Sequence, residues 1–167
     1  FRQRFPGRRI EAPRDEEFQF IEYTAQDSVL AGVEFHTDIY VTQEFVAETA
    51  FDYVRGSLEA SGDPLPRMPP FRFRGGLRYQ RNAFQAGGDW TAVAAQRRVV
   101  GGELPTEGYH LGKLFASYSF AQGRVLHTMT ARLENLTDEL YRNHLSFIKE
   151  LAPEVGRNFK LLYNVKF

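Results

Sequence analysis

The chain has 167 residues, of which 43% are hydrophobic and 14% aromatic, a composition that is sufficient for one folded domain. Lysine plus arginine and aspartate plus glutamate both number 21, so net charge favours no nucleic-acid partner. The chain has no cysteine, which excludes a disulfide framework and a thiolate metal site.

The N-terminal segment predicts a loop. Residues 1–17 carry Pro6, Gly7 and Pro13 among many charges and show no period. The segment has neither an initiator methionine nor the apolar centre of a signal peptide, so we expect either processing or a longer chain. No apolar run approaches the ~18 residues of a membrane-spanning helix, whereas crossing by strands stays compatible with the sequence.

From Phe18 onward, apolar and polar residues alternate with period two, which is typical of strands. Gln26 and Asp27 form either a turn or a bulge within the first strand, so the prediction is an all-β, antiparallel fold of seven or eight strands. The predicted strands cover residues 18–41, 45–59, 71–80, 90–100, 109–120, 125–135 and 158–167.

The segment FRFRGGLRYQ, from residue 71, indicates which environment each face of the predicted sheet meets. Its aromatic and aliphatic residues alternate with Arg72, Arg74 and Arg78. A central strand of a soluble core would bury these three arginines without partners, at a high cost in free energy. The two faces of the sheet are therefore expected to meet different solvents.

The connections between strands also follow a pattern, since short turns alternate with long loops. Strand lengths are near the ~9 to 11 residues that a tilted strand needs to cross a bilayer. Both features are typical of an outer-membrane β-barrel. The predicted turns are residues 42–44, 85–89 and 121–124, and the predicted loops are residues 61–70, 101–108 and 135–157.

The C-terminal segment NLTDELYRNHLSFIKELAPEVGRNFKLLYNVKF closely resembles the C-terminal signature of TonB-dependent outer-membrane receptors. Gly32, Val33 and Glu34 also resemble a motif of an internal strand in the same barrels, and the resemblance covers most of residues 20–167 in family order. The positions that match the signature are Asn135, Leu136, Thr137, Asp138, Tyr141, Gly156, Arg157 and Phe167.

The resemblance implies the C-terminal part of a 22-stranded transmembrane β-barrel with a plugged lumen, in which residues 18–167 form a single, incomplete domain. It implies uptake of a metal ion or metal chelate, of the zinc or iron-siderophore type, in the outer membrane of a Gram-negative bacterium, and no cofactor. The implied partners are outer-membrane lipid, the plug domain and remaining barrel strands absent here, the TonB energy-coupling complex acting through the plug, and the barrel assembly machinery.

Two sets of residues in the C-terminal segment are functional candidates. Tyr163, Val165 and Phe167 resemble the signal that engages the barrel assembly machinery. His144, with Glu139, Lys149 and Glu150, is the candidate ligand-binding set of the last loop. Histidine is the commonest metal ligand, and the loop resembles that of a subgroup associated with zinc or other metal uptake. The alternative is a structural His144 that forms hydrogen bonds within the loop.

The charged residues of the predicted inner face are expected to pair across the wall or to contact the plug. Acidic residues cluster on the earlier strands, and arginines cluster on the strand that begins at Phe71. The predicted set is Glu34, His36, Asp38, Glu48, Asp52, Arg72, Arg74, Arg78, Arg132 and Glu134.

Two other architectures fit the pattern. If Gln26 and Asp27 form a real turn, the chain is a self-contained eight-stranded outer-membrane barrel with a structural or adhesive role. A soluble antiparallel sandwich is the third, in which a second sheet covers the aromatic face. No nucleophile elbow, phosphate-binding loop or zinc-protease motif occurs, so enzymatic activity is not expected.

Overall fold

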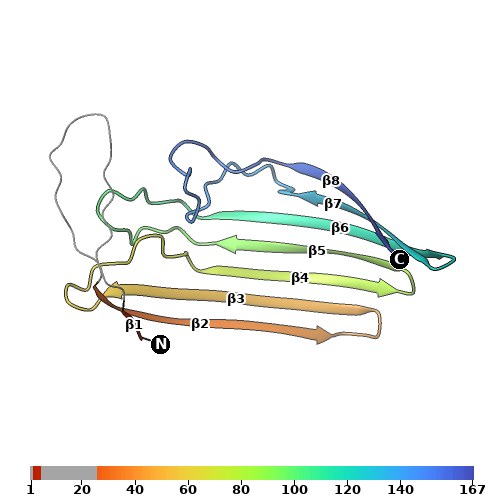
Figure 1. Ribbon diagram of the computed structural model, residues 1–167, viewed down its shortest axis with the longest axis horizontal. Coiled ribbons are helices and arrows are strands. Elements are labelled where there is room, and N and C mark those ends of the chain that lie inside the picture. Colours follow the sequence, from red (N-terminus) through yellow and green to blue (C-terminus); the bar gives the residue numbers. More distant parts are fainter. Residues whose placement is uncertain (1, 5–25) are drawn as a thin grey trace.

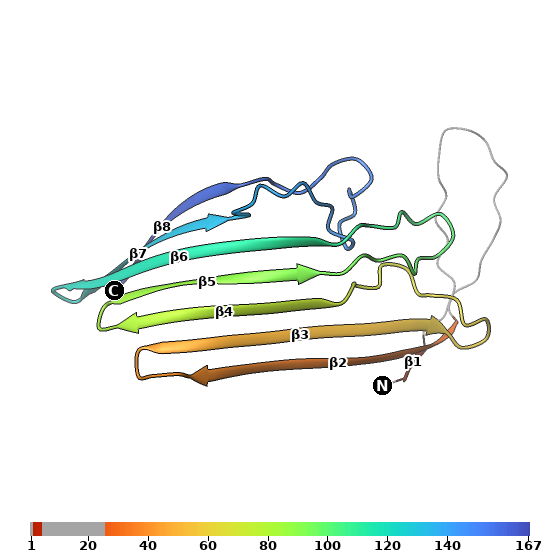
Figure 2. The same cartoon turned by 180° about the vertical axis from the view of Figure 1, so that it is seen from behind.

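The computed structural model describes residues 2–4 and 26–167. These residues form one antiparallel sheet whose strands lie in chain order, in a single curved layer (Figures 1 and 2). Within the described ranges, no helix is long and apolar enough to cross a membrane. The strands are β1 (Arg2–Arg4), β2 (Asp27–Tyr40), β3 (Phe45–Leu58), β4 (Arg72–Arg81), β5 (Phe84–Val93), β6 (Tyr109–Gln122), β7 (Val125–Glu134) and β8 (Asn158–Lys166).

The register of the strands separates two faces, as the alternation predicts. Residues directly opposite each other on paired strands have side chains on the same face. Phe51 is opposite both Phe35 and Phe73, whereas its neighbour Asp52 is opposite Arg72. We call the side of Phe51 the apolar face and the side of Asp52 the polar face. The all-β, antiparallel prediction is therefore confirmed.

The sheet has almost no interior. Among the described residues, the buried hydrophobic side chains are Val46, Met68 and Val93. On the apolar face, by contrast, Phe159 is 67% exposed and Leu161 is 64% exposed. The described residues hold one sheet and no second layer over the apolar face, so the soluble sandwich is wrong.

The sheet is also open in the described part of the chain. β8 pairs with β7, β1 pairs with β2, and no ladder joins β8 to β1. This arrangement differs from a closed eight-stranded ring, in which the first and last strands pair. Among the described strands, one backbone edge of β8 has no neighbour, and such edges pair readily with another strand.

The N-terminal loop prediction is wrong at three residues. Arg2–Arg4 form β1, which pairs with the first residues of β2, from Asp27 to Val29. The backbone edge of β2 provides hydrogen-bond partners that a sequence pattern does not reveal. The remainder of residues 1–17, and residues 18–25 of the first predicted strand, lie outside the described residues.

The short and the long connections between strands lie at opposite ends of the sheet. The short turns at residues 41–44, 82–83 and 123–124 lie at one end, and the long loops at residues 59–71, 94–108 and 135–157 lie at the other (Figure 1). In the first turn, Thr42 Oγ1 accepts hydrogen bonds from the backbone N–H groups of Glu44 and Phe45. The predicted alternation of turns and loops is thus confirmed in its pattern.

One turn was predicted in the wrong place. Residues 85–89 lie within β5, and the turn between β4 and β5 is formed by Asn82 and Ala83, where Asn82 has a φ of 51°. Asparagine tolerates this left-handed conformation better than most residues. The predicted strand at residues 90–100 correspondingly ends at Val93.

The glycines that suggested a turn instead allow close packing within the sheet. A Cβ atom at Gly87 would lie 2.6 Å from the backbone oxygen of Leu77 and 2.9 Å from Cε1 of Phe115. Phe115 is directly opposite Gly87 on β6, so its ring occupies the space where a side chain would stand.

We therefore expect Gly87→Ala to lower the free energy of unfolding by about 1–3 kcal/mol, because the methyl group meets backbone that cannot move aside. The matched control is Gly75→Ala, since the nearest atoms there belong to the Phe73 ring, at 3.6 and 3.7 Å. We expect this control to change stability by no more than about 0.5 kcal/mol. Urea titration of the complete barrel protein in detergent measures both variants, and equal losses would contradict the packing role of Gly87.

Candidate functional site

The polar face carries ion pairs that run from strand to strand. Arg72 Nε donates a hydrogen bond to Asp52 Oδ1 at 2.8 Å, between β4 and β3. On the same two strands, Arg78 Nη1 lies 2.9 Å from Glu48 Oε1. Arg72 and Arg78 thus neutralise two acids of β3, which is the pairing across the wall that the sequence predicts.

Two further polar contacts lie at the edges of this face, one within a strand and one between strands. His36 Nε2 lies 3.2 Å from Asp38 Oδ1 on β2, and Lys160 Nζ of β8 lies 2.5 Å from Glu134 Oε2 of β7. Within the described residues, Arg74 and Arg132 form no ion pair closer than 4.0 Å.

The three long loops meet at one carboxylate, that of Glu103 in the β5–β6 loop. Glu103 Oε1 lies 3.0 Å from Lys149 Nζ and 3.1 Å from His144 Nε2, both in the β7–β8 loop. The Glu103 carboxylate also accepts a hydrogen bond, at 3.2 Å, from the backbone N–H of Arg67 in the β3–β4 loop. We call Arg67, Glu103, Thr106, His144 and Lys149 the loop cluster.

His144 lies at the centre of the loop cluster, with only 2% of its surface exposed. Its Nδ1 is 3.0 Å from Thr106 Oγ1 and 3.4 Å from Lys149 Nζ. Nδ1 thus faces a hydroxyl and an ammonium group, both of which can donate to an unprotonated ring nitrogen. The contacts favour the neutral imidazole.

Burial and charge act on the two titrating groups of the loop cluster in different ways. Burial and the positive charge of Lys149 lower the pKa of His144, and the carboxylate of Glu103 opposes them only in part. Burial alone would raise the pKa of Glu103, but hydrogen bonds from Lys149 and the Arg67 backbone outweigh it and hold the pKa below its ordinary value. The loop cluster therefore combines an anion, a cation and a neutral histidine.

The structure brings together two of the four predicted ligand-binding residues. His144 and Lys149 are in contact, whereas Glu150 is exposed and the backbone N–H of Glu139 donates to Asn135 Oδ1 at 2.8 Å. Within residues 2–4 and 26–167, no group of three or more His, Asp or Glu side chains is placed to hold a metal ion. Ligand contact at these four residues stays a prediction.

The sequence did not predict the residues that the β5–β6 loop contributes to the loop cluster. Glu103 and Thr106 lie in a loop without periodicity, far along the chain from His144. Acidic and hydroxyl residues in such a loop ordinarily indicate solvent exposure. No local signal reports that they pair with a histidine of another loop.

The residues of the C-terminal signature close the base of the last loop. Asn135, which is 4% exposed, donates through Nδ2 to the backbone oxygens of Glu139, at 2.9 Å, and Val155, at 3.4 Å. Asp138 Oδ1 accepts a hydrogen bond from the Arg157 backbone N–H at 2.8 Å. The signature thus joins the two ends of the loop just before β8 begins.

Three further signature residues, Gly156, Leu136 and Tyr141, also make contacts at the ends of the loop. A Cβ atom at Gly156 would lie 2.8 Å from Asp138 Oδ1, so glycine leaves room for the carboxylate. The Leu136 backbone N–H donates to the Gly112 oxygen at 3.0 Å, and the Tyr141 ring lies 4.3 Å from that of Tyr109. These contacts anchor the loop to β6.

The predicted assembly signal lies at the opposite end of the sheet. Tyr163 and Val165 belong to the apolar face, because they are opposite Met129 and His127. The Tyr163 hydroxyl lies 2.6 Å from His127 Nδ1, and Phe167 is 97% exposed. Recognition by the barrel assembly machinery stays a prediction.

An open run of antiparallel strands, with an apolar face, an ion-paired face and long loops at one end, defines a segment of transmembrane β-barrel wall. The family described as "TonB dependent receptor-like, beta-barrel" matches residues 2–136. The chain therefore belongs to this family, whose barrels are outer-membrane proteins of Gram-negative bacteria. The resemblance that the C-terminal signature indicates is confirmed.

A solved structure shows the same fold. The structure of the copper transporter OprC matches with a TM-score of 0.72 and 26% sequence identity over 85% of this chain. The chain covers 23% of the length of OprC, which is less than a quarter of that protein. No curated protein matches the chain.

We expect Glu103→Gln to loosen all three long loops together, because it leaves Lys149 and His144 buried without their anionic partner. Loss of a buried hydrogen-bonded partner costs about 1–3 kcal/mol. Hydrogen exchange of the loop amides measures the change. The control is Glu107→Gln, whose carboxylate forms an ion pair with Arg97 that is exposed on both sides, and exchange there is expected to stay as in the wild type.

We also expect acidification to loosen the loop cluster. Because the folded protein favours neutral His144, the stabilisation is complete above the ordinary histidine pKa of about 6.5 and is lost as pH falls through the lowered pKa of the folded state. Protonation places a second positive charge beside Lys149. Loop exchange between pH 7.5 and 5 tests this, and His144→Asn should make exchange less dependent on pH.

Proposed function

We propose that the chain forms part of the barrel wall of an outer-membrane receptor that actively takes up a metal ion or a metal chelate. The observation that carries this proposal is the likeness to a copper transporter, with a TM-score of 0.72, in a chain of the TonB-dependent receptor family. The proposal concerns the complete receptor, of which the described strands are one part.

In this receptor, the polar face lines the lumen and the apolar face contacts lipid. The plug domain and the remaining strands of a 22-stranded barrel come from the rest of the receptor, and the TonB complex supplies energy through the plug. Arg74, Lys113 and Arg132 lie on the polar face and form no ion pair closer than 4.0 Å within the described residues. We assign these cations to contacts with the plug.

The free edge of β8 is where the first strand of the complete barrel would pair. The strand ends with Tyr163 and Val165 on the apolar face, followed by Phe167. An aromatic strand end of this kind supports a role as the signal for the barrel assembly machinery. The proposed location is the outer membrane of a Gram-negative bacterium.

The contacts of His144 favour its structural role in the arrangement described. Lys149 Nζ is 3.4 Å from His144 Nδ1, and this positive charge repels a metal ion at the same nitrogen. A metal contact by His144 therefore belongs to a state in which Lys149 has moved away. Glu139 and Glu150 are more accessible, so they are the predicted ligand-contact residues that need no such movement.

Metal accumulation by cells tests the proposed function. A strain that lacks the receptor gene is compared with the same strain carrying it, under limitation for copper, zinc or iron, and cell-associated metal is measured by mass spectrometry. We expect the receptor to raise the content of one metal, and a protonophore to abolish the gain because uptake needs energy. Equal contents of all three metals in the two strains, with the receptor present in the membrane, would count against metal uptake.

A further inference from the structure

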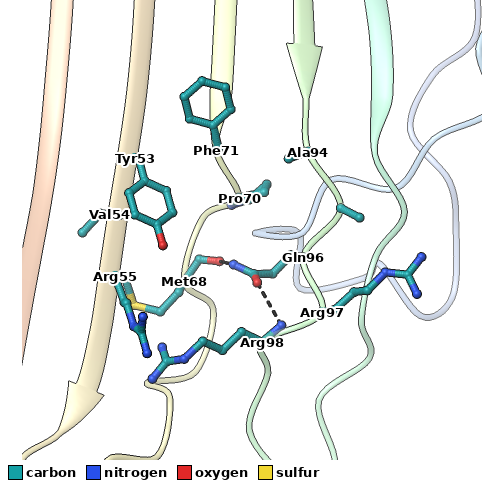
Figure 3. A pocket seen from close by; sticks show the side chains of 11 residues that line it. Tyr53, Val54, Arg55, Met68, Pro70, Phe71, Ala94, Gln96, Arg97 and Arg98 are labelled. Carbon is teal, nitrogen blue, oxygen red and sulfur yellow. Dashed lines mark hydrogen bonds between the residues drawn. The ribbon is translucent and has the colours of Figure 1, made fainter.

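A cavity of about 290 Å³ lies where β3 and β4 part (Figure 3). The ladder between these strands ends at the pair Asp52 and Arg72. Beyond this pair, β3 continues alongside β2, whereas the chain before β4 turns toward the β5–β6 loop. The cavity is the space left between residues 53–55, 68–71 and 94–98.

Several side chains that line the cavity belong to the apolar face. Tyr53 is opposite Val33, and Arg55 is opposite Ala31, so both stand on the side of the sheet that contacts lipid. Tyr53 and Phe71 are 44% and 41% exposed. The cavity lies at the long-loop end of the strands, which is the extracellular end in barrels of this type.

The charge of the cavity is positive. Its lining includes three arginines and no acidic residue. Figure 3 shows the guanidinium groups of Arg55 and Arg98 on the same side of the cavity, whereas the side chain of Arg97 points away from the other lining residues. Arg98 is held in place, because its Nη1 donates to the Gly56 oxygen at 2.8 Å. Its backbone N–H also donates to Gln96 Oε1 at 3.1 Å (Figure 3). A fixed guanidinium can bind an anion without further loss of conformational freedom.

The other two arginines differ in their surroundings. Arg97, whose side chain points away from the cavity, pairs through Nη2 with Glu107 Oε2 at 3.0 Å (Figure 3). Arg55 forms no ion pair closer than 4.0 Å within the described residues. A guanidinium group on a lipid-facing strand favours a position near headgroups, where an anion is available.

The combination identifies the ligand chemistry. Guanidinium groups bind phosphate oxygens through paired, charge-assisted hydrogen bonds. Tyr53, Phe71 and Met68 provide apolar surface beside the arginines, which suits a hydrocarbon chain. A soluble phosphate would bind the guanidinium groups and leave the apolar surface without a ligand.

We propose that this cavity binds the phosphate group of a phosphorylated lipid of the outer leaflet, with a hydrocarbon chain of that lipid against Tyr53 and Phe71. The inference rests on the outer-membrane location in the proposed function. It does not depend on metal uptake, because lipid binding is measured on purified protein without transport.

The test measures binding of diphosphoryl lipid A to the full-length receptor in detergent by native mass spectrometry. The variant is Arg55→Gln, since this side chain is exposed and the exchange should leave the fold intact. The matched control is Arg81→Gln, an arginine of the apolar face at the short-turn end, opposite Phe84. We expect at least about tenfold weaker binding in the variant and unchanged binding in the control.

Competitors separate the sources of phosphate. Inorganic phosphate at the same concentration and diacylglycerol, which has hydrocarbon chains and no phosphate, are expected not to displace lipid A. Displacement by inorganic phosphate would show a simple anion site, and displacement by diacylglycerol would show a purely apolar one; either result overturns the proposal. Equal weakening by Arg81→Gln, or binding too weak to detect in the wild type, overturns it as well.

Discussion

The structure depends on the continuous ladder of backbone hydrogen bonds from strand to strand. A single layer has no core to stabilise it, and in a membrane every backbone group of a strand needs a partner on the neighbouring strand. The register of that ladder also decides which solvent each side chain meets, because a shift by one residue exchanges the two faces. The pairing of Phe51 with Phe73, next to that of Asp52 with Arg72, shows both consequences at one point of the sheet.

The charged residues follow from this register. An arginine on the polar face of β4 reaches a carboxylate on β3 because neighbouring strands are close and their side chains are parallel. Pairs such as Arg78 with Glu48 keep the face polar while neutralising most of its charge. At the long-loop end, where β3 and β4 separate, the ladder ends, and Arg55 of β3 forms no ion pair within the described residues. The two strands thus carry ion pairs along the polar face and an arginine without an ion pair on the apolar face near their end.

The sequence predicts the strands wherever side chains alternate without interruption, as in β4, because the period itself carries the information. The prediction fails in β5, where Gly87 and Gly88 resemble a turn although they make room for neighbours such as Phe115. The true turn at Asn82 contains a single residue with a turn preference. The loop cluster was beyond prediction, since the contact between Glu103 and His144 joins two aperiodic loops and depends on the whole sheet to bring them together.

The carboxylate of Glu103 joins the three long loops. It contacts the β3–β4 loop through the Arg67 backbone and the β7–β8 loop through His144 and Lys149. Because one buried carboxylate joins them, we expect that displacing one loop strains its contacts with the other two. On this arrangement the long-loop end of the sheet would open in one concerted step, at a threshold set by one carboxylate, instead of by independent fluctuations of three segments.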